Sequence, residues 1–116
     1  MVEAKLKWGM VFTGDNLSLS EIIDYSKKAE SAGADSLWST ELGRDAFVPL
    51  SAIANATSGL RLGTAVATFA RPPMYAETAA MTMAEITNNN FTLGLGTAPP
   101  LWNENWHGLT VDRPVS

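Results

Sequence analysis

The pattern of hydrophobic and polar positions repeats four times along the chain. Strand-like segments open near Leu6, Asp35, Arg61 and Phe91, and each of the first three is followed by apolar positions at helical spacing. Within 6–12, every second residue is a large apolar one, and this period of two is typical of a strand. A repeat of about thirty residues of this kind predicts four β/α units with parallel strands.

Local signals place the three helices between these strands. Ser18 precedes Glu21 by three residues, the spacing of a capping box, in which each side chain can bond the other's free backbone amide. Gly33 suits the left-handed residue that ends a helix, and Pro49 suits the first turn of the second helix. The third helix is predicted over 74–87, and its alanines and methionines are interpreted as core packing.

The number of repeats predicts the fold class. Asparagines at 88–90 tolerate the positive φ angles of a sharp turn into the fourth strand. Because an eight-stranded barrel needs about 250 residues, four units supply half of one. We expect an α/β fold, the N-terminal half of a TIM (β/α)8 barrel, with 1–116 as a single partial domain. The chain is expected to be an N-terminal part of a longer protein.

Composition adds mainly exclusions. With 8 basic and 12 acidic residues the net charge is −4, and no Lys/Arg cluster occurs, so nucleic acid is not an expected partner. The absence of cysteine and the single histidine argue against disulfides and against a metal site. No apolar run has membrane-spanning length, so no membrane partner is expected and the cytoplasm is the expected location.

The strand-to-helix loops are the expected place for chemistry. Parallel strands joined by right-handed crossovers bring these loops to one end of the sheet, where α/β proteins bind ligands. The loops cover 13–18, 40–45, 68–73 and 97–114, and they are rich in hydroxyls, tryptophan and backbone amides. They contain few acid/base pairs.

Motifs at these strand ends point to a family. In chain order they are Trp38–Phe47, Leu62–Val66, Arg71–Pro73, and Leu93–Thr97 leading to Trp102–Gly108. The set resembles the luciferase-like monooxygenase superfamily, and within it the deazaflavin-dependent reductases. The resemblance covers nearly the whole chain and implies a TIM barrel with insertions. It also implies hydride transfer or monooxygenation on a flavin-type ring, either FMN or an 8-hydroxy-5-deazaflavin, lying across the carboxyl ends of the strands.

The resemblance implies cofactor contacts for six residues. Ala65 and Val66 occupy the place where relatives have a bulge with a non-prolyl cis peptide behind the central ring. Four further residues fall where relatives contact the ring edge, ribityl chain or phosphates: Thr40, Thr68, Thr97 and Asn103. Hydroxyls and amides suit these contacts because they need no matched charge. An ordinary strand end with turn and cap residues is the open alternative.

Glu41 is the candidate catalytic residue implied by the resemblance. It aligns with the position at which sugar-phosphate dehydrogenases of the family have a catalytic histidine. Half of a loop ion pair with Arg44 is its alternative role. Ala98–Pro100 stand where those dehydrogenases have a glutamate, which argues against a sugar-phosphate substrate. His107 has either a structural, packed role, which we favour, or a catalytic one.

Three functional hypotheses follow. The chain is the N-terminal part of a flavin- or deazaflavin-dependent oxidoreductase, inactive alone; or two copies pair so that edge strands one and four are covered; or it is a non-catalytic half-barrel that binds a partner through an apolar inner face. An open parallel sheet leaves unpaired edges and an uncovered hydrophobic face. We therefore expect a homo-oligomer, with a dimer as first choice.

Overall fold

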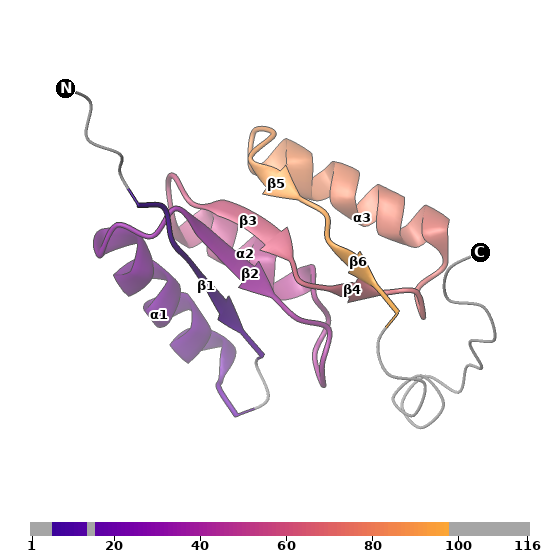
Figure 1. Ribbon diagram of the computed structural model, residues 1–116, viewed down its shortest axis with the longest axis horizontal. Coiled ribbons are helices and arrows are strands. Elements are labelled where there is room, and N and C mark those ends of the chain that lie inside the picture. Colours follow the sequence, from indigo (N-terminus) through magenta and orange to yellow (C-terminus); the bar gives the residue numbers. More distant parts are fainter. Residues whose placement is uncertain (1–5, 14–15, 98–116) are drawn as a thin grey trace.

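A computed structural model of the chain describes residues 6–13 and 16–97. Figure 1 shows the three helices in chain order along the sheet, from the edge strand β1 to the edge strand β5. In chain order the elements are β1 (Gly9–Phe12), α1 (Leu19–Ser31), β2 (Ser36–Ser39), α2 (Val48–Ala56), β3 (Arg61–Thr64), β4 (Ala67–Thr68), α3 (Pro73–Ile86), β5 (Phe91–Thr92) and β6 (Leu95–Gly96).

Every strand pair in the described residues is parallel. Strands β1, β2, β3 and β5 form one sheet in that order, and β4 pairs with β6 beside it. The third and fourth predicted strands are each broken in two, the third at Ala65 and Val66 and the fourth around Gly94. The predicted α/β fold with parallel strands is confirmed, and the strand breaks are a feature that periodicity alone did not predict.

The local signals for helix ends are confirmed with one difference. The Glu21 amide donates to Ser18 Oγ over 3.1 Å, as in a capping box, but the Ser18 hydroxyl in turn donates to the Glu21 carboxylate over 3.2 Å. Gly33 has a φ of 94°, while Asn88 and Asn89 have φ angles of 54° and 65°. Residues that tolerate positive φ therefore stand where the chain turns out of α1 and α3.

The hydrophobic core lies between the three helices and one face of the sheet. Its largest buried apolar side chains are Ile22 from α1, Leu37 from β2, Leu50 and Ile53 from α2, and Leu62 from β3. Burial of such a side chain contributes about 1.5–3 kcal/mol each. This packing positions the strands so that their carboxyl ends, and the loops that follow them, lie on one side of the molecule.

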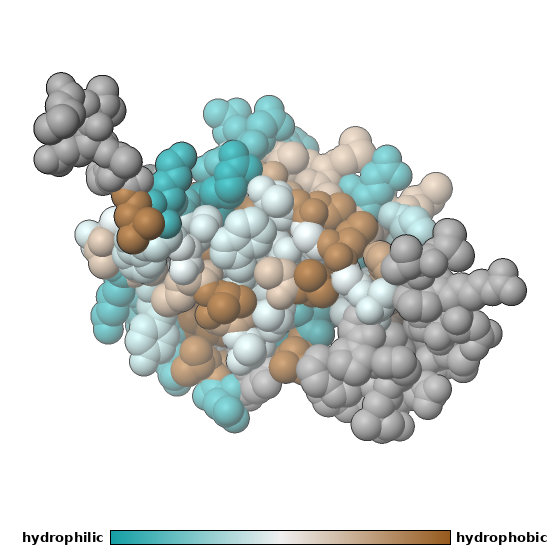
Figure 2. All heavy atoms as spheres, viewed as in Figure 1, coloured by the Kyte–Doolittle hydropathy of each residue, from teal (hydrophilic) through white to brown (hydrophobic). Residues whose placement is uncertain are grey.

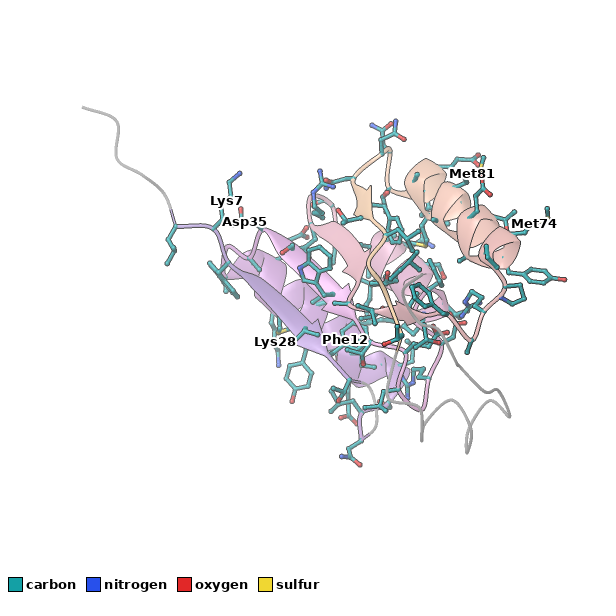
Figure 3. The ribbon with its side chains drawn as sticks, turned by 45° about the vertical axis from the view of Figure 1, so that its right-hand side comes forward. Lys7, Phe12, Lys28, Asp35, Met74 and Met81 are labelled. Carbon is teal, nitrogen blue, oxygen red and sulfur yellow. The ribbon has the colours of Figure 1, made fainter. Side chains whose placement is uncertain are left out.

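The core interpretation of the α3 methionines is correct for only one of them. Met83 is 3% exposed and belongs to the core, whereas Met74 and Met81 are 73% and 64% exposed. Both project from α3 into solvent in Figure 3. The prediction for these two is wrong because α3 packs mainly against α2 and β5 within the described part of the chain, and Met74 and Met81 lie on its solvent-exposed surface.

The face of the sheet opposite the helices is mixed in character. Val11, Trp38, Gly63 and Thr92 lie in register across it. Val11 is exposed, but the Trp38 indole donates to a serine hydroxyl, and Arg61 donates to Thr92 Oγ1 over 3.1 Å. Figure 2 shows hydrophobic side chains interspersed with polar ones on the side in view. This face of the sheet therefore combines exposed apolar side chains with polar contacts.

None of the three helices in residues 6–13 and 16–97 combines the length and the apolar content that crossing a bilayer requires.

Candidate functional site

Candidate residues from two loops meet at the carboxyl ends of β2 and β3. The Glu41 amide donates to the carbonyl oxygen of Val66 over 3.2 Å, and the Ala65 amide donates to the carbonyl oxygen of Ser39 over 2.7 Å. The Thr68 amide donates to Glu41 Oε2 over 2.8 Å. The loop after β2 is thus bonded directly to the broken third strand. We call these two segments, 40–47 and 65–71, the rim.

The break in the third strand has the backbone geometry that the resemblance implies. The peptide bond between Ala65 and Val66 is cis, and this prediction is confirmed. Ala65 is exposed, so only a methyl group covers the backbone at this point of the rim. Val66 is half-buried and packs beside Gly96, where an added Cβ would lie 2.5 Å from Val66 Cγ2. The fourth strand can therefore approach the rim this closely only because Gly96 has no side chain.

Glu41 is an ion-pair residue, but its partner differs from the predicted one. Its side chain is 11% exposed, and Arg71 Nη2 donates to its Oε1 over 2.5 Å. Arg44 instead donates from Nη2 to the carbonyl oxygen of Leu17 over 2.8 Å, which ties the rim to the β1–α1 loop. The predicted Arg44 partner is wrong because a side chain thirty positions away along the chain reaches Glu41 from the next loop.

Asp45 is a second acid at the rim that sequence reasoning left without a role. Arg71 Nη2 also donates to Asp45 Oδ2 over 2.5 Å, while Asp45 Oδ1 accepts from the amides of Phe47 and Val48 over 2.7 and 2.8 Å. The signal was present, since aspartate just before a helix commonly binds its first free amides. Asp45 therefore caps α2 and binds Arg71 at once.

The electrostatics of the rim follow from these contacts. Burial acts to raise the pKa of Asp45, but hydrogen bonds from the Val48 amide, Arg71 and the Phe47 amide outweigh it and hold that pKa below its usual range. Burial likewise acts to lower the pKa of Arg71, but the Asp45 and Glu41 carboxylates outweigh it and raise that pKa. The Arg71 guanidinium also lies 5.0 Å from the centre of the Phe47 ring.

The predicted hydroxyl contacts differ in their surroundings. The half-buried Thr40 hydroxyl donates to the carbonyl oxygen of Phe12 over 3.4 Å. Thr68 is 4% exposed, and its Oγ1 has no hydrogen-bond partner within residues 6–13 and 16–97. Thr97 directly follows β6. Because β6 pairs in parallel with β4, which ends at Thr68, Thr97 lies at the same end of the sheet as Thr68. Asn103, His107 and 98–100 lie outside the described residues.

Two further features describe the surroundings of the rim. A groove of about 390 Å³ opens between α3 and β6; its lining includes Thr68, Phe69, Ala80, Met81 and Leu95. In the described part of the chain, no three His, Cys, Asp or Glu side chains are grouped so that they could hold a metal ion. The rim offers hydrogen-bond donors, one arginine between two acids, and an adjacent apolar groove.

Comparison of the sequence with known proteins finds one family. Residues 7–116 match the family model described as luciferase-like monooxygenase. An uncharacterised protein of Mycobacterium bovis is 36% identical over 80 residues, which cover 68% of this chain and 24% of the relative. Uncharacterised proteins of two Mycobacterium tuberculosis strains match with the same values. The chain spans about a quarter of the length of these curated relatives.

Comparison of the structure finds proteins of similar fold. The oxygenating constituent of 3,6-diketocamphane monooxygenase from Pseudomonas putida, in complex with FMN, has a TM-score of 0.77 at 19% identity, covering 91% of this chain and 33% of that one. The coenzyme F420 dependent tetrahydromethanopterin reductase from Methanopyrus kandleri has a TM-score of 0.77 at 20% identity, covering 87% and 30%. Monooxygenase RslO1 from Streptomyces bottropensis has a TM-score of 0.70 at 18% identity, covering 94% and 38%. The fold resembles the N-terminal part of such barrels, as predicted.

Proposed function

This chain belongs to the luciferase-like monooxygenase family, and we propose that it forms the cofactor-facing N-terminal part of a flavin- or deazaflavin-dependent oxidoreductase. The observation that carries the proposal is the rim at the carboxyl ends of the strands, where the Glu41 amide donates to the Val66 carbonyl oxygen and the Glu41 carboxylate accepts from the Thr68 amide. Ligands of α/β folds bind at this end. One structural neighbour is in complex with FMN and another depends on coenzyme F420, so we propose FMN or a deazaflavin as the cofactor class.

The rim fits a flat ring in two respects. Ala65 is exposed and small, so a ring can approach the backbone there without a steric barrier. The buried Thr68 hydroxyl has no partner among the described residues, and a buried polar group of this kind needs one. We assign cofactor contacts to Thr40, Ala65, Val66, Thr68, Thr97 and Asn103. When bound, the cofactor supplies the hydride-transfer or oxygen chemistry, and these residues orient it and exclude water.

Glu41 is the proposed acid/base residue of the rim. Both of its carboxylate oxygens already accept hydrogen bonds, one from the Thr68 amide and one from Arg71. An ionised carboxylate carries a negative charge and only accepts hydrogen bonds. We therefore propose that Glu41 acts as a proton acceptor or as a fixed negative charge near the ring edge.

The proposal is tested by adding FMN or the 8-hydroxy-5-deazaflavin to the purified chain and following the fluorescence of the added ring. We expect saturable quenching by the wild-type chain. Ala65→Leu should weaken binding about tenfold or more, because a larger side chain occupies the place of the ring. Thr78→Leu, at an exposed position on α3, is the control and should bind normally. If the wild-type chain quenches the fluorescence of neither FMN nor the deazaflavin, the proposal is refuted.

We also propose that the isolated chain self-associates, first of all as a dimer, through its open sheet edges. Val11 on the edge strand β1 is 57% exposed, and Leu95 on β6 is 48% exposed. Among residues 6–13 and 16–97, β1 and β6 each pair with one strand only, which leaves an edge that a second copy can bind. Light scattering should show a dimer that Leu95→Lys shifts towards monomer, whereas Met74→Lys on α3 leaves it unchanged. A monomer at high concentration refutes this proposal.

A further inference from the structure

We propose that Arg71 is the positioning residue of the rim, because it binds Glu41 and Asp45 together and thereby holds the loop after β2 against the strand end that carries Ala65 and Thr68. The inference rests on the proposed function only in taking a cofactor to face the rim, because the hydrogen bonds of Arg71 to Glu41 and Asp45 lie within this chain. Arg71 has no role in the family assignment beyond its place in the motif Arg71–Pro73.

Two acids converge on one nitrogen of Arg71. Arg71 Nη2 lies 2.5 Å from Glu41 Oε1 and 2.5 Å from Asp45 Oδ2. The two acids stand four positions apart in one loop, and Gly43 between them has a φ of 68°, a conformation that glycine adopts without steric cost. The loop therefore turns so that both carboxylates point at the same guanidinium, which comes from the following loop.

Each acid holds a different part of the rim with its other oxygen. Glu41 Oε2 accepts from the Thr68 amide at the end of β4. Asp45 Oδ1 accepts from the amides of Phe47 and Val48 at the start of α2. Arg71 thus connects a strand end, a loop and a helix start through two carboxylates. Loss of its side chain would break both links at once.

The site favours an arginine over other cations. The guanidinium lies 5.0 Å from the centre of the Phe47 ring, and Phe47 is buried. A planar guanidinium can stack on a ring while it donates in its own plane, which a lysine ammonium cannot do. Without the guanidinium, two negative charges would face each other in a partly buried site, and their repulsion would distort the loop that carries both acids and the contact of Glu41 with the strand end.

Amide hydrogen exchange tests this positioning role directly. We expect Arg71→Met to accelerate exchange of the Thr68, Phe47 and Val48 amides by about tenfold or more, since each donates to one of the two carboxylates. Arg71→Lys should give an intermediate effect. Arg61→Met, which removes an arginine that donates to Thr92 Oγ1 instead, is the control and should leave these amides unchanged. Unchanged exchange in Arg71→Met would overturn the inference.

A charge-rescue variant keeps the test decisive if Arg71→Met folds poorly. Adding Glu41→Gln and Asp45→Asn to Arg71→Met removes the repulsion while keeping the side-chain sizes, so folding should be restored. A triple variant as unstable as Arg71→Met would count against the proposed electrostatic role.

A binding measurement separates this inference from the proposed function. If the wild-type chain quenches FMN or the deazaflavin, Arg71→Met should raise the dissociation constant about tenfold, and Arg71→Lys should raise it less. Arg61→Met should not change the dissociation constant. If Arg61→Met raised the dissociation constant as much as Arg71→Met does, the inference would be overturned. If the wild-type chain quenches neither cofactor, the proposed function fails, and the exchange measurement still decides the role of Arg71.

Discussion

The close approach of the third and fourth strands at Gly94 leads to the sharpest stability prediction. A Cβ added at Gly94 would lie 2.1 Å from the carbonyl oxygen of Thr64 and 3.3 Å from its carbonyl carbon. Both are backbone atoms, so no side-chain rotation can relieve the clash. Gly94→Ala must therefore push the two strand ends apart.

The displacement would also weaken hydrogen bonds that join these strands. The Thr64 hydroxyl donates to the Gly94 carbonyl oxygen over 2.8 Å and accepts from the Gly94 amide over 2.9 Å. The Ala67 amide donates to the same carbonyl oxygen over 2.9 Å. Overpacking costs about 1–3 kcal/mol, and each lost hydrogen bond about 1 kcal/mol. We expect Gly94→Ala to lower the free energy of unfolding by about 3 kcal/mol.

Urea unfolding followed by tryptophan fluorescence measures the change in the free energy of unfolding. In thermal unfolding, the expected fall in Tm is roughly 10–20 °C for a domain of this size. Gly59→Ala is the matched control, because no atom lies within 4 Å of the added Cβ and its φ is not in the left-handed region. The control should be neutral or stabilising by about 0.4–1 kcal/mol, through the lower entropy of the unfolded chain. A Gly94→Ala variant as stable as the control would refute the reasoning.

Two further predictions concern polar contacts outside the rim. In the turn before β3, the amides of Ser58 and Gly59 donate to Glu30 Oε2 over 2.9 and 2.8 Å, and the Ser58 amide also donates to Oε1 over 3.1 Å. These bonds, led by the one from Gly59, outweigh the effect of burial and lower the Glu30 pKa. The ionised Glu30 carboxylate therefore stabilises the fold fully above pH 4.5, its ordinary pKa, and this stabilisation is lost as the pH falls through the lower pKa of the folded state. The difference in unfolding free energy between wild type and Glu30→Gln should shrink on acidification. A difference that stays constant with pH contradicts this prediction. Ser18→Ala should cost about 1 kcal/mol in thermal unfolding by removing the cap of α1, whereas Ser51→Ala, which removes only a solvent-exposed hydrogen bond to the Val48 carbonyl oxygen, should cost less.

Much of the candidate site could be predicted from where the strands end. The order of the strand-to-helix loops and the right-handed crossover place Thr40, Glu41 and Thr68 at one end of the sheet. The motif resemblance located the cis peptide between Ala65 and Val66. The partner of Glu41 could not be predicted, because Arg44 is its near neighbour in sequence, whereas one helix and two strands separate Glu41 from Arg71 along the chain.

The sequence by itself determined the local conformation of this protein. Alternation of apolar residues, the Ser18 cap, the glycine at 33 and the asparagines at 88–90 act over a few residues, and a few residues suffice to identify them. Tertiary structure decided which methionines are buried on α3 and that one guanidinium serves both acids of the rim. Such features depend on distances between segments some thirty residues apart, and those distances exist only once the strands have paired and the helices have packed.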